Sequence, residues 1–223
     1  KVSEKGTFVL KYSGEDRGMG YLSSEDNKAY VIVLAGEDIK LTGGLLSIPE
    51  SVTISAGEEN LLFDQYLHEH PIREQALSAW IYLRRIYRVD PLFRDEMEAK
   101  LAVEKEINKI KNQDQHFLSS LDARSYISWY LPVRKLVSSV SVIAQYRPAE
   151  IPETIEAFRN IDYLDERLYR SGLLKDVIES HYWLIENMGK SLDSVYSEMN
   201  ISTDRLLSNI SSNEIAFNEI TKF

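Results

Sequence analysis

The spacing of hydrophobic residues changes along this chain near residue 60. Before that point hydrophobic and polar residues alternate, as in the run 7–12, and a two-residue period is typical of β-strands. From Asn60 onward the period is 3.6 residues, which is typical of α-helices. The pattern predicts an α+β protein, with a small N-terminal antiparallel β unit over residues 1–59 and an all-helical bundle domain over residues 60–223.

Four short strands are predicted in the first unit, at residues 7–12, 30–34, 39–41 and 52–54. Glycine-rich segments separate them, and we interpret Gly18-Met19-Gly20 as a turn. Four short strands bury little apolar surface by themselves. We therefore expect either that the unit packs on the helical domain or that strands are missing from its start.

In the second unit, the periodicity predicts several helices, over about 72–89, 92–118, 125–142, 153–161, 173–188 and 214–223. Pro71 and Pro91 are expected in first turns, where proline is tolerated, and Ser202 is expected to cap a further short helix. One apolar stripe is predicted to form core in the first helix: Ile72, Ala76, Ala79, Trp80, Leu83, Ile86 and Tyr87. The second helix is highly charged, with a narrow apolar seam of Val103, Ile107, Ile110 and Phe117.

Composition and charge limit the classes of function. The 223 residues are 43% hydrophobic and 27% charged, within the globular range, and a length of this kind suits one or two domains. The formal net charge is −9 and no segment is strongly basic, so we expect no nucleic-acid partner. The absence of cysteine excludes disulfides, thiolate metal sites and cysteine nucleophiles within these residues.

Few residues are candidates for catalysis or metal binding. His68-Glu69-His70 lacks the spacing of a zinc helix, which needs histidines four positions apart; we interpret it as a solvated helix end before Pro71. His181 lies on an apolar stripe and is expected to be a hydrogen-bonded core histidine, since no nucleophile signature accompanies it. We therefore assign no catalytic, cofactor-binding or metal residues, and we expect no cofactor.

Aromatic residues give the better candidates for binding. Trp183 lies opposite the apolar stripe of its predicted helix at about 100° per residue, so either another helix of the bundle covers it or it is a docking surface. Trp129 and Tyr130 lie beside Arg134. That combination suits an interface or a sugar contact, and it equally suits the edge of a core with basic side chains reaching past it to solvent.

Four segments resemble a known family: VLAGEDIKLTG (33–43), EHPIREQALSAW (69–80), WYLPVRKLVSSV (129–140) and RSGLLKDVIESHYWLIENMGKSLDSVY (170–196). They are similar to the N-terminal region of thioredoxin-like thiol–disulfide oxidoreductases of anaerobic gut bacteria, of the TlpA-like or alkyl hydroperoxide reductase/thiol-specific antioxidant (AhpC/TSA) type. The resemblance extends over essentially the whole chain and is most specific at 170–196.

The resemblance implies an order of domains. In such proteins a small β domain of unknown function and a helical domain precede a thioredoxin fold, and the thioredoxin fold holds the Cys-x-x-Cys motif. We expect that domain downstream of Phe223, and a periplasmic or cell-envelope location, with membrane attachment only through a lipid anchor outside this chain. This region would then be a non-catalytic accessory or interaction region. Its expected partners are the thioredoxin-like domain, a protein substrate or a second copy of the chain.

The alternative is a ligand-binding module for an envelope glycan or peptide, which would use Trp129, Tyr130 and Arg134. A closed aromatic pocket would favour this alternative, whereas a flat exposed aromatic patch would favour the interaction region.

Overall fold

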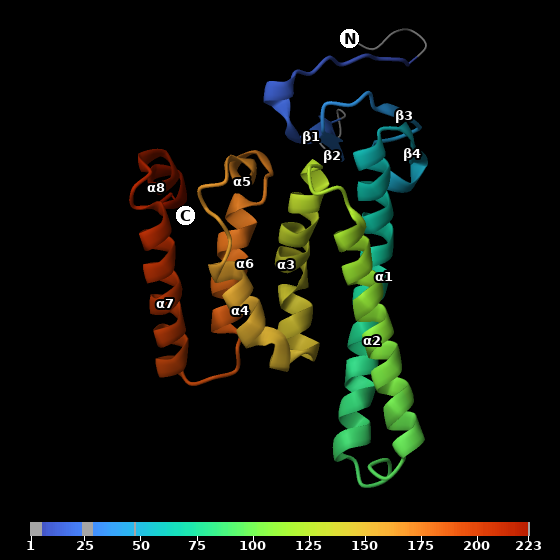
Figure 1. The fold of residues 1–223 in the computed structure, drawn as a ribbon, viewed down its shortest axis with the longest axis vertical. Helices are drawn as coiled ribbons and strands as arrows, with labels where there is room; N and C mark the ends of the chain where they lie inside the picture. The colour runs from blue at the N-terminus through green and yellow to red at the C-terminus, as the bar shows by residue number, and fades with distance from the viewer. Residues whose placement is uncertain (1–5, 24–28, 47, 223) are drawn as a thin grey trace.

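Two small antiparallel sheets precede a series of helices in the computed structural model, which describes residues 6–23, 29–46 and 48–222 (Figure 1). The strands are β1 (Gly18–Ser23), β2 (Ala29–Leu34), β3 (Lys40–Gly43) and β4 (Val52–Ala56). The helices are α1 (Glu58–Val89), α2 (Met97–Ser120), α3 (Tyr126–Tyr146), α4 (Ile151–Arg159), α5 (Glu166–Arg170), α6 (Leu174–Glu186), α7 (Leu192–Ile210) and α8 (Glu214–Ile220). This order confirms the α+β class with an N-terminal β unit and a helical bundle.

The β unit consists of two separate two-stranded sheets. β1 pairs with β2 in a register that places Gly18 opposite Leu34, and β3 pairs with β4, with an irregularity at Lys40 and Leu41. Three of the four predicted strands therefore correspond to β2, β3 and β4.

Two predictions for the start of the chain were wrong. The run 7–12 has no regular secondary structure, and Leu10 is 64% exposed, because its alternating residues face no sheet. The glycines predicted as a turn instead begin β1. A Cβ at Gly18 would lie 3.0 Å from the carbonyl oxygen of Arg170, so glycine here permits a close approach of β1 to α5.

A buried asparagine joins the β unit to α1. Asn60 is fully buried; its side-chain oxygen accepts a hydrogen bond from the Val33 amide at 2.8 Å, and its amide group donates to the Val33 carbonyl at 2.8 Å. The Glu37 carboxylate accepts hydrogen bonds from the backbone N–H groups of Glu58 and Glu59, which satisfies donors of the first turn. The β unit and the bundle therefore meet through specific polar contacts, as well as through apolar residues of the main core.

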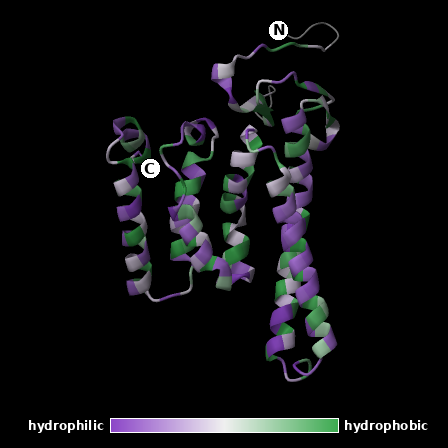
Figure 2. Ribbon diagram, in the orientation of Figure 1, coloured by the Kyte–Doolittle hydropathy of each residue, from purple (hydrophilic) through white to green (hydrophobic). Residues whose placement is uncertain are grey.

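α1 and α2 form a long antiparallel pair that projects away from the other helices (Figure 1). Its outer part has its own apolar cluster of Leu77, Ile81, Val103, Ile107 and Ile110, so the predicted α2 seam is confirmed at its three aliphatic positions. Much of the remaining surface of this pair is hydrophilic (Figure 2).

The sequence-based boundaries and buried face of α1 need correction. Pro71 lies inside the helix rather than in a first turn, and its ring is exposed, so the backbone loses one hydrogen bond without ending the helix. The predicted core stripe is displaced around the axis, because Ile72 is 68% exposed while Leu77 and Ile81 face α2. Pro91 does not begin a helix either; Asp90 ends α1, and α2 begins at Met97.

α3 lies at the centre of the main core and contacts α1, α2, α4 and α6. Pro132 lies within this helix. The prediction for Ser202 was wrong: it is buried in the middle of α7 instead of capping a helix. Among the described residues, no helix combines the length and the apolar character needed to cross a lipid bilayer.

Candidate functional site

One buried carboxylate connects three helices. Asp114, on α2, accepts hydrogen bonds from Nδ1 of His70 at 2.9 Å and from Nε of Arg73 at 3.3 Å, both on α1. The ammonium group of Lys135, on α3, donates to its other oxygen. Asp114 is 5% exposed, and a buried carboxylate of this kind needs such partners to remain charged.

The electrostatics agree with an ionised Asp114. Burial by itself would raise the pKa of this carboxyl, but the hydrogen bonds from His70 and Lys135 and the charges of those groups outweigh burial and hold its pKa well below the usual range. The ring of Tyr66 stacks on His70, with 4.7 Å between centroids. Burial raises the pKa of the Tyr66 hydroxyl far above its ordinary value, so this group stays neutral.

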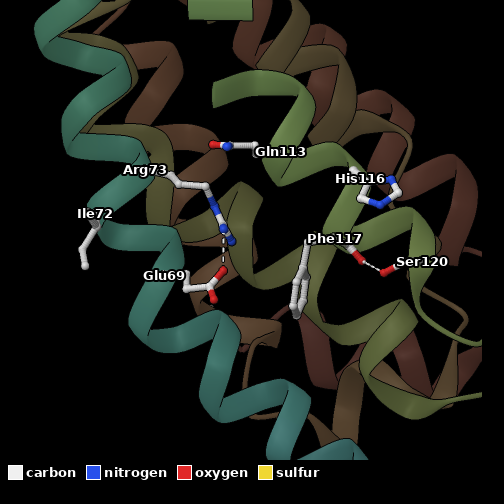
Figure 3. Close-up of a pocket in the computed structure, with 7 residues that line it drawn as sticks. All are labelled: Glu69, Ile72, Arg73, Gln113, His116, Phe117 and Ser120. Carbon is white, nitrogen blue, oxygen red and sulfur yellow. Dashed lines mark hydrogen bonds and ion pairs between the residues drawn. The ribbon is translucent and has the colours of Figure 1, made fainter. Parts of the chain in front are cut away.

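An open cavity of about 450 Å³ lies beside this network, between α1 and α2. Figure 3 shows Glu69 and Arg73 extending from α1 toward α2, with Phe117 facing them and Ile72 pointing away. Arg73 donates to Glu69 at 2.6 Å and lies 5.9 Å from the ring centre of Phe117. Glu69 and Asp114 balance the charge of this guanidinium, while its Nη2 is buried and has no hydrogen-bond partner among the described residues.

The three-residue motif at 68–70 lies in the middle of α1 rather than at a helix end, which corrects our interpretation. Its two histidines have different surroundings: His68 is exposed and near Asp64, whereas His70 is buried against Asp114. Across residues 6–23, 29–46 and 48–222, no group of three or more His, Asp or Glu side chains is arranged to hold a metal ion.

His181 is a core histidine. It is 4% exposed, stacks on Phe158 with 5.2 Å between centroids, and its Nε2 lies 3.1 Å from the hydroxyl of Ser202. Burial, and next the charge of Arg159, lower the pKa of His181 to about 4. The ring is therefore neutral at pH 7. Its Nε2 and the Ser202 hydroxyl share a hydrogen bond, and the Ser202 oxygen also accepts from Nε of Arg159 at 3.0 Å.

The aromatic and basic residues singled out in α3 are engaged within the fold. Tyr130 is 2% exposed in the main core, and Arg134 donates to its hydroxyl at 3.5 Å. Trp129 packs on the edge of that core, and the guanidinium of Arg167 lies 5.0 Å from its ring centre. These residues are near one another, but they do not line either of the two cavities described here.

Trp183 has a different environment. It is 40% exposed on α6, while Val177, Leu184 and Ile185 on the same helix are fully buried. The predicted separation of Trp183 from the apolar stripe of its helix is therefore present. At 40% exposed, Trp183 is covered in part within this chain and open to solvent in part, and its role in docking stays a prediction.

A second cavity, of about 280 Å³, was not predicted. It lies between the N-terminal segment, the start of α3 and α5, and we call it the arginine cavity because four arginines line it: Arg17, Arg124, Arg167 and Arg170. No local run of basic residues marks these positions in the sequence. Only the folded arrangement brings them together.

The chain was compared with protein-family models, with curated proteins and with solved structures, and none of them matches it. The fold and the geometry above are therefore the observations on which a function rests, and the resemblance to thioredoxin-like oxidoreductases stays a prediction.

Proposed function

We propose that this chain is a non-catalytic binding region of a larger cell-envelope thiol–disulfide oxidoreductase, in which it positions a thioredoxin-like domain or that domain's partner. The resemblance at residues 170–196 supports this proposal, and the same segment contains Trp183. The 223 residues hold no cysteine, and thiol–disulfide exchange requires a thiolate. The redox chemistry would therefore belong to the downstream domain.

The single observation that supports a binding role most directly is the exposure of Trp183. Tryptophan is among the largest apolar side chains, so the 40% of Trp183 that is exposed leaves a sizeable apolar area for a partner to cover. Its helix already buries a core face through Val177, Leu184 and Ile185, and Trp183 lies outside that face. Aromatic residues of this kind dominate binding energy at protein interfaces.

The glycan or peptide alternative is less well supported. A sugar ring would stack on an open aromatic face, but Arg167 lies over Trp129 and the core encloses Tyr130. Arg167 would have to move before Trp129 could receive a ligand. We therefore keep the interaction region as the leading proposal.

Binding in trans tests the proposal. The reading frame beyond Phe223 is determined first, and the expected thioredoxin-like domain is then produced separately and titrated into this chain by calorimetry. We expect Trp183→Ala to weaken association about tenfold or more, as the loss of an interface tryptophan does. The control is Tyr82→Ala on α1: Tyr82 is an aromatic residue that is 58% exposed, and its replacement is expected to leave the affinity unchanged. A reading frame without a Cys-x-x-Cys domain, or equal affinities for both variants, contradicts the proposal.

The proposed location is the periplasm or another part of the cell envelope, with a lipid anchor outside these residues as the means of attachment. Fractionation of cells that produce the full-length protein tests this. Recovery of the full-length protein in the cytosolic fraction contradicts it.

A further inference from the structure

The arginines that line the arginine cavity come from three segments that are distant in the sequence. Arg17 lies between a short 3₁₀ turn (Gly14–Asp16) and β1, Arg124 precedes α3, and Arg167 and Arg170 lie on α5. Only one carboxylate residue, Glu166, shares the lining with these four guanidinium groups. Such a concentration is unusual in a chain with a net charge of −9. All four side chains are exposed; Asp122 pairs with Arg124 and Asp165 with Arg167, whereas Arg17 and Arg170 have no ion pair with a carboxylate among the described residues.

Two of the arginines are held in place by carboxylates that do not line the cavity. Arg124 donates from Nη2 to Asp122 at 3.0 Å, and Arg167 donates from Nη2 to Asp165 at 2.6 Å. Each guanidinium has five N–H donors in a rigid fork, and a carboxylate on one edge leaves donors on the other. These pairs therefore orient the arginines without using all of their hydrogen-bonding capacity.

The N-terminal segment completes the cavity by binding α5. Nη1 of Arg170 donates to the backbone oxygen of Glu15 at 2.6 Å, a contact between residues 155 positions apart. The close approach at Gly18 packs β1 on the same helix. Arg17 lies directly before Gly18 and is exposed, and its charge acts on the Glu59 carboxylate. Within the described ranges no side chain accepts a hydrogen bond from its guanidinium, so these donors are open to a ligand.

The backbone N–H groups at the start of α3 would not bind a ligand in the arginine cavity, because they already have partners. Glu59 accepts from the backbone N–H of Ile127 at 3.0 Å, and the hydroxyl of Ser125 accepts from the backbone N–H of Ser128 at 3.2 Å, so this helix end is already capped. Tyr126, which lines the cavity, is 4% exposed, and its hydroxyl has no hydrogen-bond partner among the described residues. This hydroxyl is itself buried, so Tyr126 contributes its ring to the cavity wall and no donor to a ligand.

From these contacts we infer that the arginine cavity binds a small soluble oxyanion, namely a phosphate or carboxylate group of an organic ligand, through Arg17, Arg167 and Arg170. Guanidinium forks match the two oxygens of such groups and form charge-assisted hydrogen bonds with them. The cavity volume of about 280 Å³ suits a small molecule rather than a polymer. This inference does not depend on the proposed function, because it involves neither Trp183 nor a thioredoxin-like domain.

Pyrophosphate and citrate serve as probes, titrated into the whole chain by calorimetry at constant ionic strength. They differ in the acidic group that they present, so the pair distinguishes phosphate from carboxylate. We expect saturable binding of at least one of them. Arg17→Gln is expected to weaken it about tenfold or more, since charge-assisted bonds are lost. The control Arg85→Gln removes the same charge at an exposed position of α1 and is expected to leave the affinity unchanged.

Trp129 provides a second, local measurement, because Arg167 lies over its ring. With Trp80 and Trp183 replaced by Phe, Trp129 is the last of the three tryptophans. A ligand that engages Arg167 is expected to change its fluorescence with the same dissociation constant as the calorimetry. Non-saturable binding, equal weakening by Arg17→Gln and Arg85→Gln, or binding without a change in Trp129 emission would each overturn the inference. Binding to vesicles of phosphatidylglycerol but to neither soluble probe would overturn it as well and would indicate a membrane surface.

Discussion

His70 and Asp114 face each other across the α1–α2 pair, with 2.9 Å between Nδ1 and Oδ1. Apolar contacts alone leave two long helices free to slide, since aliphatic seams are tolerant of small shifts. A buried carboxylate with three donors on two other helices has one arrangement that satisfies it. The network around Asp114 therefore fixes how α1, α2 and α3 sit along one another.

Asp114→Asn is expected to destabilise the fold by about 2–3 kcal/mol, because it leaves the cations of Arg73 and Lys135 without their buried counter-charge. The partly exposed Lys135 recovers some solvation, which keeps the loss below that of a fully buried pair. Urea unfolding followed by circular dichroism at pH 7 measures the change in the free energy of unfolding.

Asp204→Asn is the matched control. Asp204 is exposed on α7, so we expect a change within about 0.5 kcal/mol. Equal losses for the two variants would mean that the Asp114 network does not stabilise the structure.

The buried His181 makes stability depend on pH. Burial and the charge of Arg159 lower its pKa to about 4 in the folded chain, against about 6.5 in the unfolded chain. The unfolded state thus binds the proton more readily, so this contribution is present above pH 6.5 and is lost as the pH falls through about 4. Between pH 7 and 5 the expected loss is about 2 kcal/mol.

His181→Gln separates this contribution from the other titrating groups. Glutamine keeps a hydrogen-bonding group near Ser202 but does not titrate, so the loss of stability between pH 7 and 5 should shrink by about 2 kcal/mol relative to the native chain. The free energy of unfolding of both proteins is measured in urea at pH 7, 6 and 5. The same pH dependence in both would exclude His181 as its source.

Much of the helical region could be predicted from the sequence, because long stretches with a 3.6-residue period have few other ways to bury their apolar face. The errors fall where tertiary contacts override local rules. Pro71 continues a helix whose neighbouring turns are held by packing against α2, and Gly18 begins a strand because α5 approaches its backbone. The local sequence around Pro71 or Gly18 does not show that α2 or α5 packs against it.

The candidate sites were harder to predict than the fold. Asp114 is one of four acidic residues on α2, and its position opposite His70 and Lys135 distinguishes it. The arginine cavity likewise joins residues that are far apart in the sequence, such as Arg17 and Arg170. Trp183 was identified because helical geometry places it on one face of its own helix, and that requires no knowledge of the rest of the chain.

Thiol reductase activity is expected to be absent from this chain. The reaction needs a thiolate that attacks a disulfide sulfur, and these residues contain no cysteine. Reduction of insulin by dithiothreitol is monitored by turbidity with and without the protein, and thioredoxin is the positive control. A rate above the uncatalysed one would contradict the non-catalytic role.

Trp183 is expected to contribute to binding and less than a core residue to the stability of this chain. It is 40% exposed, whereas Leu184 and Ile185 beside it are fully buried, so truncation removes only part of the contacts that a core substitution removes. We expect Trp183→Ala to lower the free energy of unfolding by about 1–2 kcal/mol and Leu184→Ala, the matched core variant, to lower it by about 2–5 kcal/mol. Acrylamide quenching in a variant with Trp80 and Trp129 replaced by Phe measures exposure directly: efficient quenching is expected, because solvent reaches the ring. Strong protection from acrylamide would mean that Trp183 is buried by the bundle itself, and the docking role would then lose its principal residue.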